Sequence, residues 1–283
     1  MYIRDLMTSS VITAPPTMSL ALAQRLMHDH RIRHLPVVQG PQLVGLVTDR
    51  DLRQALPSSI TTLTPAEMTY KMGTIAIATC MTHEVITVPP EADIVQGTRR
   101  LLEGPYGCLP VLSSEQLVGL VTAIDLLRGF LMDLGGVAAH LPVRTYMHFA
   151  PLTGHKDDLV SQAQQRMHRA TIRHLPIVTE DGKLLGLLSD RDLLQAGASS
   201  VPLLTSYEAP LLLMTMMVKD MMTTNVHAVT EETSVAAAGQ LFLDYKLGCL
   251  PVVCTGNRLT GILTVTDLLR AYVDLQQTRA ATA

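Results

Sequence analysis

Short apolar runs around residue 40 predict a β-hairpin. Leu35–Val38 and Leu43–Val47 are hydrophobic at nearly every position, and Gln39–Pro41 between them contains the Gly-Pro pair typical of a turn. Because Leu43–Val47 is apolar throughout, we expect it to be buried on both faces. A short strand is expected upstream at Val11–Thr13, and Thr48 is expected to open a helix directly after the hairpin.

The stretch between the first strand and the hairpin predicts an amphipathic helix. Thr17 or Ser19 is a suitable N-cap, and the helix should continue to about His30 with Leu22 and Leu26 on one face. The complete unit therefore has the order strand, helix, strand, strand, helix. With fewer than about sixty residues it buries little apolar surface, so two units are expected to pack sheet to sheet.

The same unit occurs four times along the chain. Each copy has an opening that begins with Met, then a segment containing Leu-Pro, then a phrase with Gly, Thr or Ser, and Asp at fixed places. This last phrase reads GLVTDRDL at 45–52, GLVTAIDL at 119–126, GLLSDRDL at 186–193 and GILTVTDL at 261–268. Copies one and three contain RHLP, whereas copies two and four contain GCLP. The alternation indicates that a pair of units was duplicated.

These repeats predict an α/β (α+β) fold made of four βαββα units in two pairs. The expected organisation is repeat 1 at 1–56, a linker helix at 57–76, repeat 2 at 77–133, repeat 3 at 134–198, a second linker helix at 199–217, repeat 4 at 218–275 and a tail at 276–283.

The Thr-x-x-Asp pattern in the fourfold phrase has two interpretations. In the first, Thr48 caps a helix and Asp51 bonds back to the amide of the cap, which requires no ligand. In the second, the helix N-terminus attracts a phosphate, Thr48 donates to a phosphate or sugar oxygen, and Asp51 accepts hydrogen bonds from ribose hydroxyls. Gly45 would let a backbone or a flat base come close.

Basic residues near this phrase favour a ligand. They recur in the odd-numbered repeats, where arginine side chains beside a helix N-terminus would form charge-assisted hydrogen bonds with phosphate. A capping box alone does not require them. The residues are Arg33, His34 and Arg50 in repeat 1, and Arg173, His174 and Arg191 in repeat 3.

The four repeats resemble the CBS domain (cystathionine-β-synthase domain) over nearly the whole chain. The resemblance rests on the fixed order of three motifs: the Met-Thr opening, the Leu-Pro segment and the Gly-Thr-Asp phrase. The resemblance implies pairing of the repeats into two Bateman modules, stacked as a disc. It also implies adenosine-nucleotide binding in clefts between paired repeats. The linker after the first repeat further resembles that of stand-alone bacterial CBS-pair proteins.

The resemblance assigns roles to residues of all four repeats. Ribose would be held by Asp51, Asp125, Asp192 and Asp267, and Thr48, Thr122, Ser189 and Thr264 would touch ribose or phosphate. The base would lie against the opening and the Leu-Pro segment of the paired repeat. For the Asp51 site these segments include Ile86, Thr87, Cys108 and Pro110, and for the Asp125 site they include Ile12, Thr13 and the Arg33–Pro36 stretch.

Two departures from the pattern suggest that fewer than four sites are occupied. Repeats 2 and 4 have Ile124 and Thr266 where the odd repeats have Arg, so their positive charge would be borrowed across the cleft. The opening of repeat 3, MHFAPLTG, lacks the expected strand ending, which puts the pocket paired with Asp267 in doubt.

The composition disfavours a nucleic-acid-binding, a secreted and a membrane-spanning protein. The formal charge is −3 and aromatic residues make up 4%, which disfavours a nucleic-acid binder. The start of the chain is not typical of a signal peptide, and no apolar run is long enough for a membrane helix. With four cysteines in no metal-binding or disulfide pattern, we expect a cytoplasmic protein. The histidines near residue 30 do not form a metal site, since no Cys or carboxylate set converges with them.

The sequence contains no catalytic motif, so we expect no enzyme activity. The favoured function is a regulatory sensor of AMP, ADP or ATP that signals occupancy to an unidentified protein partner, as a monomeric disc or a homodimer. Apart from this nucleotide no cofactor is expected, although Mg²⁺ would accompany ATP. The alternatives are a ligand-free scaffold and a binder of S-adenosylmethionine or a diadenosine polyphosphate, of which the cationic sulfonium fits the basic residues poorly.

Overall fold

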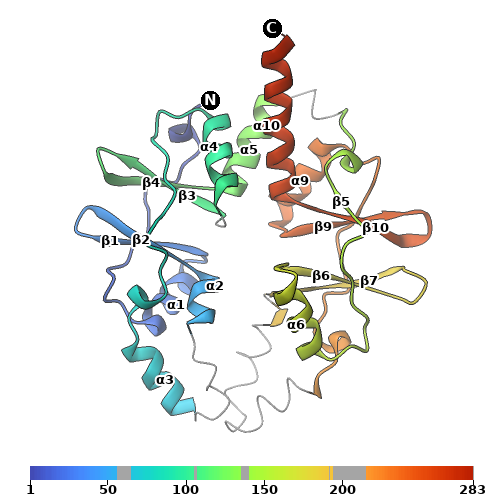
Figure 1. Cartoon of the computed structure of the whole chain (residues 1–283), viewed down its shortest axis with the longest axis horizontal. Helices are drawn as coiled ribbons and strands as arrows, with labels where there is room; N and C mark the ends of the chain where they lie inside the picture. Colours follow the sequence, from blue (N-terminus) through green and yellow to red (C-terminus); the bar gives the residue numbers. More distant parts are fainter. Residues whose placement is uncertain (56–64, 105–106, 135–139, 191, 194–214, 283) are drawn as a thin grey trace. The chain divides into compact units, whose positions relative to one another are not determined.

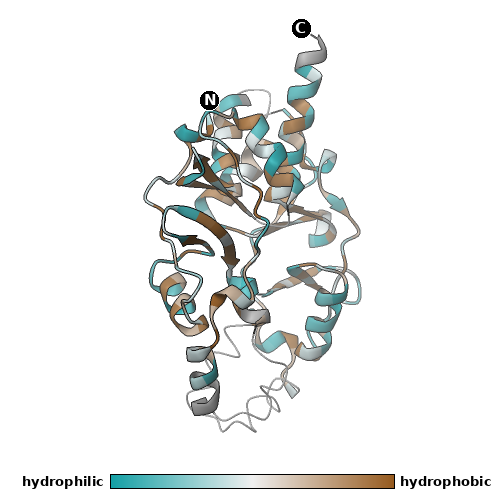
Figure 2. Cartoon of the chain, turned by 60° about the vertical axis from the view of Figure 1, so that its left-hand side comes forward, coloured by the Kyte–Doolittle hydropathy of each residue, from teal (hydrophilic) through white to brown (hydrophobic). Residues whose placement is uncertain are grey.

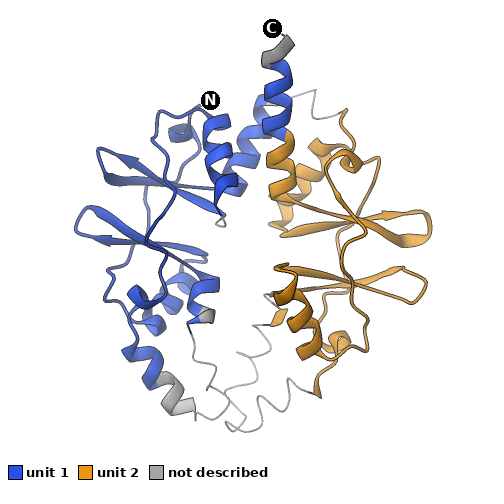
Figure 3. Cartoon of the chain, in the orientation of Figure 1, with its two compact units in different colours: residues 1–133, 272–283 blue, residues 134–271 orange. Residues whose placement is uncertain are grey.

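The computed structural model describes residues 1–55, 65–104, 107–134, 140–190, 192–193 and 215–282 (Figure 1). The chain divides into unit 1, residues 1–133 with 272–283, and unit 2, residues 134–271 (Figure 3). Each unit contains two of the four repeats. The prediction of a mixed α/β fold built from four repeats is confirmed.

The helices and strands of unit 1 follow the same order twice. The first repeat has the 3₁₀ turn η1 (Ile3–Asp5), α1 (Leu20–Asp29), β1 (His34–Gln39), β2 (Gln42–Thr48) and α2 (Asp49–Gln54). Helix α3 (Pro65–Thr74) comes next and lies in the expected linker. The second repeat has η3 (Ile77–Thr79), α4 (Ile94–Glu103), β3 (Cys108–Ser113), β4 (Gln116–Thr122) and α5 (Ala123–Leu134).

Unit 2 follows a similar order, with the short strands β5 and β8 and the 3₁₀ turn η7 in addition. The third repeat has η5 (Val143–Thr145), β5 (His148–Phe149), α6 (Val160–Arg169), β6 (His174–Val178) and β7 (Leu184–Ser189). The fourth has η6 (Val218–Asp220), β8 (Val229–Thr230), α9 (Val235–Tyr245), β9 (Cys249–Cys254), η7 (Thr255–Asn257), β10 (Arg258–Thr264) and α10 (Val265–Thr282). The expected second linker helix at 199–217 lies mostly outside the described residues.

Each repeat is built around an antiparallel hairpin, as the hydrophobic pattern predicts. In the first, His34 lies opposite Thr48 and Leu35 opposite Val47, and the register shifts at Val37–Val38. The other three hairpins shift at the corresponding place, which shows how closely the repeats agree. In unit 1 the two hairpins are also joined edge to edge by one pair, Gln42 and Gln116, which gives the strand order β1-β2-β4-β3.

The expected first strand at Val11–Thr13 is wrong. The chain makes one parallel bridge, between Ala14 and Val37, with hydrogen bonds from Ala14 N to Pro36 O (3.1 Å) and from Val38 N to Ala14 O (2.9 Å). Two prolines follow Ala14 directly and cannot donate the backbone hydrogen bonds that would extend the ladder. In repeat 4, where no proline follows, two residues form strand β8 beside β9.

The buried face of α1 differs in part from the predicted one, because Leu26 packs partly buried against the core but Leu22 does not. Ser19 is the N-cap, its hydroxyl accepting from Leu22 N at 3.4 Å, but Leu22 itself is 59% exposed. The residues that enter the core are Leu20, Ala23 and Met27, spaced by three and four along the helix. They pack with the hairpin residues Leu35, Val37 and Val47, and unit 2 repeats this arrangement with Ala163, Met167, Leu175 and Ile177.

Strand β2 is less buried than its composition suggests. Gly45, Leu46 and Val47 are buried, but Leu43 and Val44 are only half-buried because they lie near the exposed hairpin turn. Figure 2 shows the hydrophobic residues of the hairpin strands in brown. Among the described helices, none is long and apolar enough to cross a membrane.

Candidate functional site

The Thr-x-x-Asp pair, or Ser-x-x-Asp in repeat 3, forms a cap at the start of the helix after each hairpin. In repeat 1, one carboxylate oxygen of Asp51, Oδ2, accepts from Thr48 N and from Thr48 Oγ1, both at 2.7 Å. Asp51 N in turn donates to Thr48 Oγ1 at 3.3 Å. The corresponding carboxylate bonds recur at 2.6–3.0 Å in the other repeats, between Thr122 and Asp125, Ser189 and Asp192, and Thr264 and Asp267. The capping interpretation is therefore confirmed as geometry.

The cap leaves part of each group for other contacts. Thr48 uses its only hydroxyl proton on Asp51, so toward a ligand it offers a lone pair rather than the donor that the sequence pattern suggested. Asp51 uses Oδ2 in the cap, and no described residue donates a hydrogen bond to its Oδ1. The half-buried Asp192 has the same arrangement. An acceptor oxygen is thus held at a helix N-terminus in both odd repeats.

The opening of the paired repeat crosses each cap-bearing strand. Thr82 of repeat 2 bonds to Leu46 on β2 through both of its backbone groups, at 2.9 Å each. Equivalent bridges join Thr8 to Leu120 and Thr223 to Leu187, and His148 pairs with Ile262. Cys80 lies close enough that the charge of Asp51, after burial, raises the pKa of its thiol. Each candidate site therefore takes residues from both repeats of its unit.

The glycine of the phrase makes room for protein, not for a base. A Cβ on Gly45 would lie 2.7 Å from Met81 Sδ and 2.9 Å from the Thr82 carbonyl oxygen. Met7, Met222 and Met147 fill the same place over Gly119, Gly186 and Gly261. The prediction that Gly45 lets a backbone come close is confirmed by the Thr82 carbonyl, whereas the alternative of a flat base is wrong, because the opening methionine of the paired repeat occupies the space.

The hairpin register brings the backbones of the basic residues of the odd repeats next to the cap. His34 lies opposite Thr48 in the hairpin, and the carbonyl of the exposed Arg33 accepts from Asp49 N at 3.1 Å. Arg50 is half-buried inside the cap itself. In repeat 3, His174 lies opposite Ser189 and the Arg173 carbonyl accepts from Asp190 N at 3.0 Å. Arg191 lies outside the described residues.

A contact between the two kinds of Leu-Pro segment explains their alternation. A Cβ on Gly107 would lie 3.5 Å from His34 Nε2, and a Cβ on Gly248 would collide with the ring of His174. Histidine in one repeat therefore goes with glycine in its partner. Both motifs are visible in the sequence but their contact is not, although their strict alternation is the signal that could have revealed it.

The even repeats do not depend only on charge borrowed from their partners. Arg128 NH1 lies 3.3 Å from Asp125 Oδ1, and Arg270 NH1 lies 3.2 Å from Asp267 Oδ1. Each arginine is three residues beyond its aspartate on the same helix, a spacing that places both on one face. Sequence reasoning missed these arginines because it compared only the positions inside the cap.

The residues expected to enclose the base divide into two groups. Ile12, Thr13, Ile86 and Thr87 are half-buried in the extended openings, where their side chains remain partly accessible. Cys108 and Pro110 are buried in β3, and burial raises the pKa of the Cys108 thiol to about 12. Cys249 and Cys254 stand at opposite ends of the single strand β9, so they do not face each other across a hairpin.

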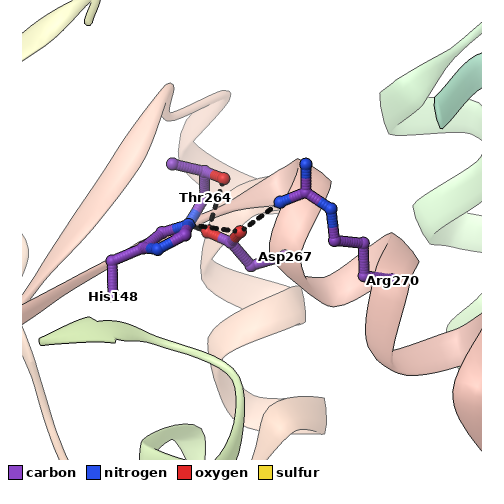
Figure 4. Close-up of polar contacts among 4 residues, drawn as sticks. All are labelled: His148, Thr264, Asp267 and Arg270. Carbon is purple, nitrogen blue, oxygen red and sulfur yellow. Dashed lines mark hydrogen bonds and ion pairs between the residues drawn. The ribbon is translucent and has the colours of Figure 1, made fainter. Parts of the chain in front are cut away.

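Asp267 differs from the other three aspartates (Figure 4). Its side chain is only 3% exposed, and its Oδ1 is contacted by His148 Nε2 at 3.0 Å as well as by Arg270. Figure 4 shows the carboxylate between these two side chains, with Thr264 bonded to its other oxygen. The opening of repeat 3 otherwise follows the usual path, since Gly154 bridges to Ile177 as Ala14 does to Val37. The departure is thus the histidine, not the strand ending.

The described residues include no cluster of three or more His, Cys, Asp or Glu side chains arranged to hold a metal ion. His34 faces Gly107, and His28 contacts Asp29 at 3.4 Å. The chemistry that the four sites offer is hydrogen bonding by a fixed carboxylate beside a helix N-terminus, with arginine and histidine nearby.

Comparison with known proteins places these observations in a family. A model of the CBS domain matches residues 3–58, 76–131, 143–199 and 218–274. Protein MJ1225 from Methanocaldococcus jannaschii is 23% identical over 270 residues, which cover 93% of this chain and 95% of that protein. The inosine-5'-monophosphate dehydrogenase of Korarchaeum cryptofilum is 37% identical over 116 residues, but these cover 41% of this chain and 21% of that enzyme.

Solved structures agree at the level of the fold. The crystal structure of MJ1225, described as a proposed archaeal homolog of g-AMPK, matches with a TM-score of 0.79 at 20% identity, covering 96% of this chain and 100% of that one. An uncharacterized conserved protein from Pyrococcus horikoshii matches with a TM-score of 0.69 at 18% identity over the same shares. Because one family model matches four times, over most of the length and once in every repeat, the chain belongs to the CBS domain family.

Proposed function

We propose that this protein is a regulatory sensor that binds adenine nucleotides at the caps between paired repeats and signals their occupancy to a protein partner. AMP, ADP and ATP are the proposed ligands, with Mg²⁺ accompanying ATP. No catalytic role is proposed. The cytoplasm is the proposed location, where the four free cysteines would stay reduced. The two units correspond to the two expected Bateman modules, and their stacking as a disc remains a prediction.

The observation that carries this proposal is the environment of Asp51. Its Oδ2 is fixed by the cap, and its Oδ1 receives no hydrogen bond from a described residue, so it can accept from a ribose hydroxyl. Arg33, His34 and Arg50 are brought to the same helix N-terminus by the hairpin register. A ligand with neighbouring hydroxyl and phosphate groups matches this combination.

The same environment favours anionic ligands over S-adenosylmethionine. The backbones of three basic residues lie at or beside the cap of repeat 1, and those of two of the three in repeat 3 lie in matching positions. A sulfonium cation would be repelled by these groups, whereas the phosphates of a mononucleotide or a diadenosine polyphosphate would be attracted. The basic residues therefore act as the predicted selectivity element of the odd repeats.

A thermal-shift panel tests the proposal. AMP, ADP, ATP, GTP, S-adenosylmethionine and diadenosine polyphosphates would be compared with and without Mg²⁺. A ligand at a hundred times its Kd should stabilise the folded protein by about 2.7 kcal/mol. We expect a shift with adenine nucleotides that is lost in Asp51→Asn.

Asp93→Asn is the matched control. Asp93 caps α4 in the same kind of reciprocal box and accepts from Gln96 N at 2.8 Å. It does not belong to any of the four candidate nucleotide sites. It should lose stability without losing the nucleotide shift. Equal loss of the shift in both variants would contradict a binding role for Asp51.

One observation favours the scaffold alternative: in all four repeats the aspartate accepts from the backbone N–H of the cap residue without any ligand. If every compound in the panel leaves the melting temperature unchanged, the phrase serves as a helix cap only. Asp51→Asn and Asp93→Asn would then differ in nothing except their small capping effects, about 1 kcal/mol each.

A further inference from the structure

The Asp267 carboxylate is already saturated by the protein. Oδ2 accepts from Thr264 N at 2.8 Å and from Thr264 Oγ1 at 2.6 Å, and Oδ1 is contacted by His148 at 3.0 Å and Arg270 at 3.2 Å. A carboxylate has about four lone-pair positions, so these four contacts use its capacity as an acceptor. The side chain is also nearly removed from solvent, at 3% exposure.

The other three sites lack the contact from an opening segment. Thr8, Thr82 and Thr223 stand where repeat 3 has His148, each bridged to the strand that precedes a cap. A threonine hydroxyl is too short to span the distance that the imidazole covers, and no described opening residue donates to the other aspartates. Asp125 keeps 17% side-chain exposure, with Arg128 alone on its Oδ1.

We propose that His148 closes the fourth site, so that the chain offers at most three sites to a nucleotide. This inference rests on the proposed function, because it takes the aspartate Oδ1 to be the ribose acceptor. A ribose at Asp267 would have to displace His148 from a buried carboxylate, and the lost hydrogen bond would have to be replaced in the same place. His148 is thus a specificity-determining residue that acts by occupying the sugar position.

The closure also assigns a structural task to Asp267. Asp267 lies in the first turn of helix α10 and its carboxylate contacts His148 from β5, so it ties the opening of repeat 3 to the helix of repeat 4. In the other repeats the threonine at this place is joined to the cap-bearing strand through a backbone bridge, and no described contact runs from its side chain to the capping aspartate. The carboxylate that is the proposed ribose acceptor in the other three repeats therefore links two segments of unit 2 in repeat 4.

The experiment counts bound nucleotides per chain by equilibrium dialysis with radiolabelled AMP. Asp51→Asn should lower the number by one relative to the wild type, whereas Asp267→Asn should leave it unchanged. His148→Thr, which copies the other three openings, should raise it by one. The double variant H148T/D267N should return to the wild-type number, since the opened site would then lack its acceptor.

The outcomes separate this inference from the proposed function. If Asp51→Asn lowers the number and Asp267→Asn lowers it too, His148 does not close the site, although the sensor function stands. If His148→Thr melts like the wild type but binds no additional AMP, the closure is likewise overturned. If neither the wild type nor His148→Thr binds AMP, both proposals fail. Should His148→Thr unfold, His148→Ser is the substitute variant, with the same expected gain.

Discussion

At the residue scale, burial strongly changes the pKa of two thiols, those of Cys108 and Cys249. They begin β3 and β9, at 1% and 3% exposure, and burial raises the pKa of each to about 12. Such a thiol in the unfolded chain ionises near about pH 8.5. Their neutral, apolar burial agrees with the interpretation of these cysteines as small core residues.

These two thiols predict a loss of stability at alkaline pH. Above about pH 8.5 the unfolded state releases protons that the folded state retains, so the free energy of unfolding falls as pH rises, by about 1.4 kcal/mol per pH unit for each thiol. Their contribution is complete below that range and declines until the folded pKa, about 12, is reached. Urea unfolding at pH 8 and pH 10 measures it. The control C108A/C249A should decline less steeply, and an equal decline would contradict the burial effect.

Local contacts of single residues could be predicted from the sequence, whereas contacts between repeats could not. The bond from Thr48 to Asp51 follows from their spacing of three, because both residues lie in one helical turn. The packing of Met81 over Gly45 and of His34 against Gly107 depends on how two repeats pair, which no local pattern encodes. The closure of Asp267 by His148 was missed for the same reason, since 119 residues separate the two.

At the element scale, the strand before each cap and the opening of the paired repeat fit because glycine lacks a side chain. In Gly45→Ala the new Cβ would lie 2.9 Å from a backbone oxygen, that of Thr82, which cannot move without disturbing the bridge to Leu46. We expect this variant to lose about 1–3 kcal/mol of unfolding free energy. Gly119→Ala should lose less, because the atoms nearest to its Cβ all belong to the flexible side chain of Met7.

Gly73→Ala provides the control for this prediction. Gly73 is exposed near the end of α3, and a Cβ added to it would meet no atom within 4 Å, so alanine there should be neutral or stabilising by up to about 1 kcal/mol. Chemical denaturation of the three variants gives the order. If Gly45→Ala is as stable as Gly73→Ala, the opening of repeat 2 does not pack tightly enough against β2 to exclude a Cβ.

Element boundaries were predicted well where apolar periodicity ended at a turn, as in the hairpin of β1 and β2. They were predicted poorly where a proline removed a donor, as after Val11–Thr13. The face of α1 was partly misjudged because Leu22 and Leu26 satisfy the helical spacing as well as Leu20 and Met27 do. Tertiary packing selects between two such stripes, and spacing alone does not.

At the scale of the whole molecule, the fourfold repetition predicted the fold. The boundary between the two units, however, does not follow the boundaries of the repeats. Helix α10 begins in repeat 4, yet residues 272–283 belong to unit 1 (Figure 3). There Tyr272 is buried, with its ring 5.1 Å from that of Phe130, and its hydroxyl donates to Asp133 Oδ2 at 2.9 Å. Burial and the neighbouring Asp133 raise the pKa of Tyr272, which keeps the phenol neutral as a donor.

Tyr272 is therefore predicted to stabilise unit 1 although it lies far along the chain from the rest of that unit. Tyr272→Ala removes the ring from a site with no solvent access and should lower the unfolding free energy by about 3–5 kcal/mol. Tyr272→Phe keeps the ring and loses one hydrogen bond, so its loss should be about 1 kcal/mol, since Gln276 still donates to Asp133. Gln277→Ala, on the exposed side of the same helix, should change stability by less than about 0.5 kcal/mol. If Tyr272→Ala and Gln277→Ala unfold at the same urea concentration, the end of α10 does not support unit 1, and its contact with Phe130 is energetically neutral.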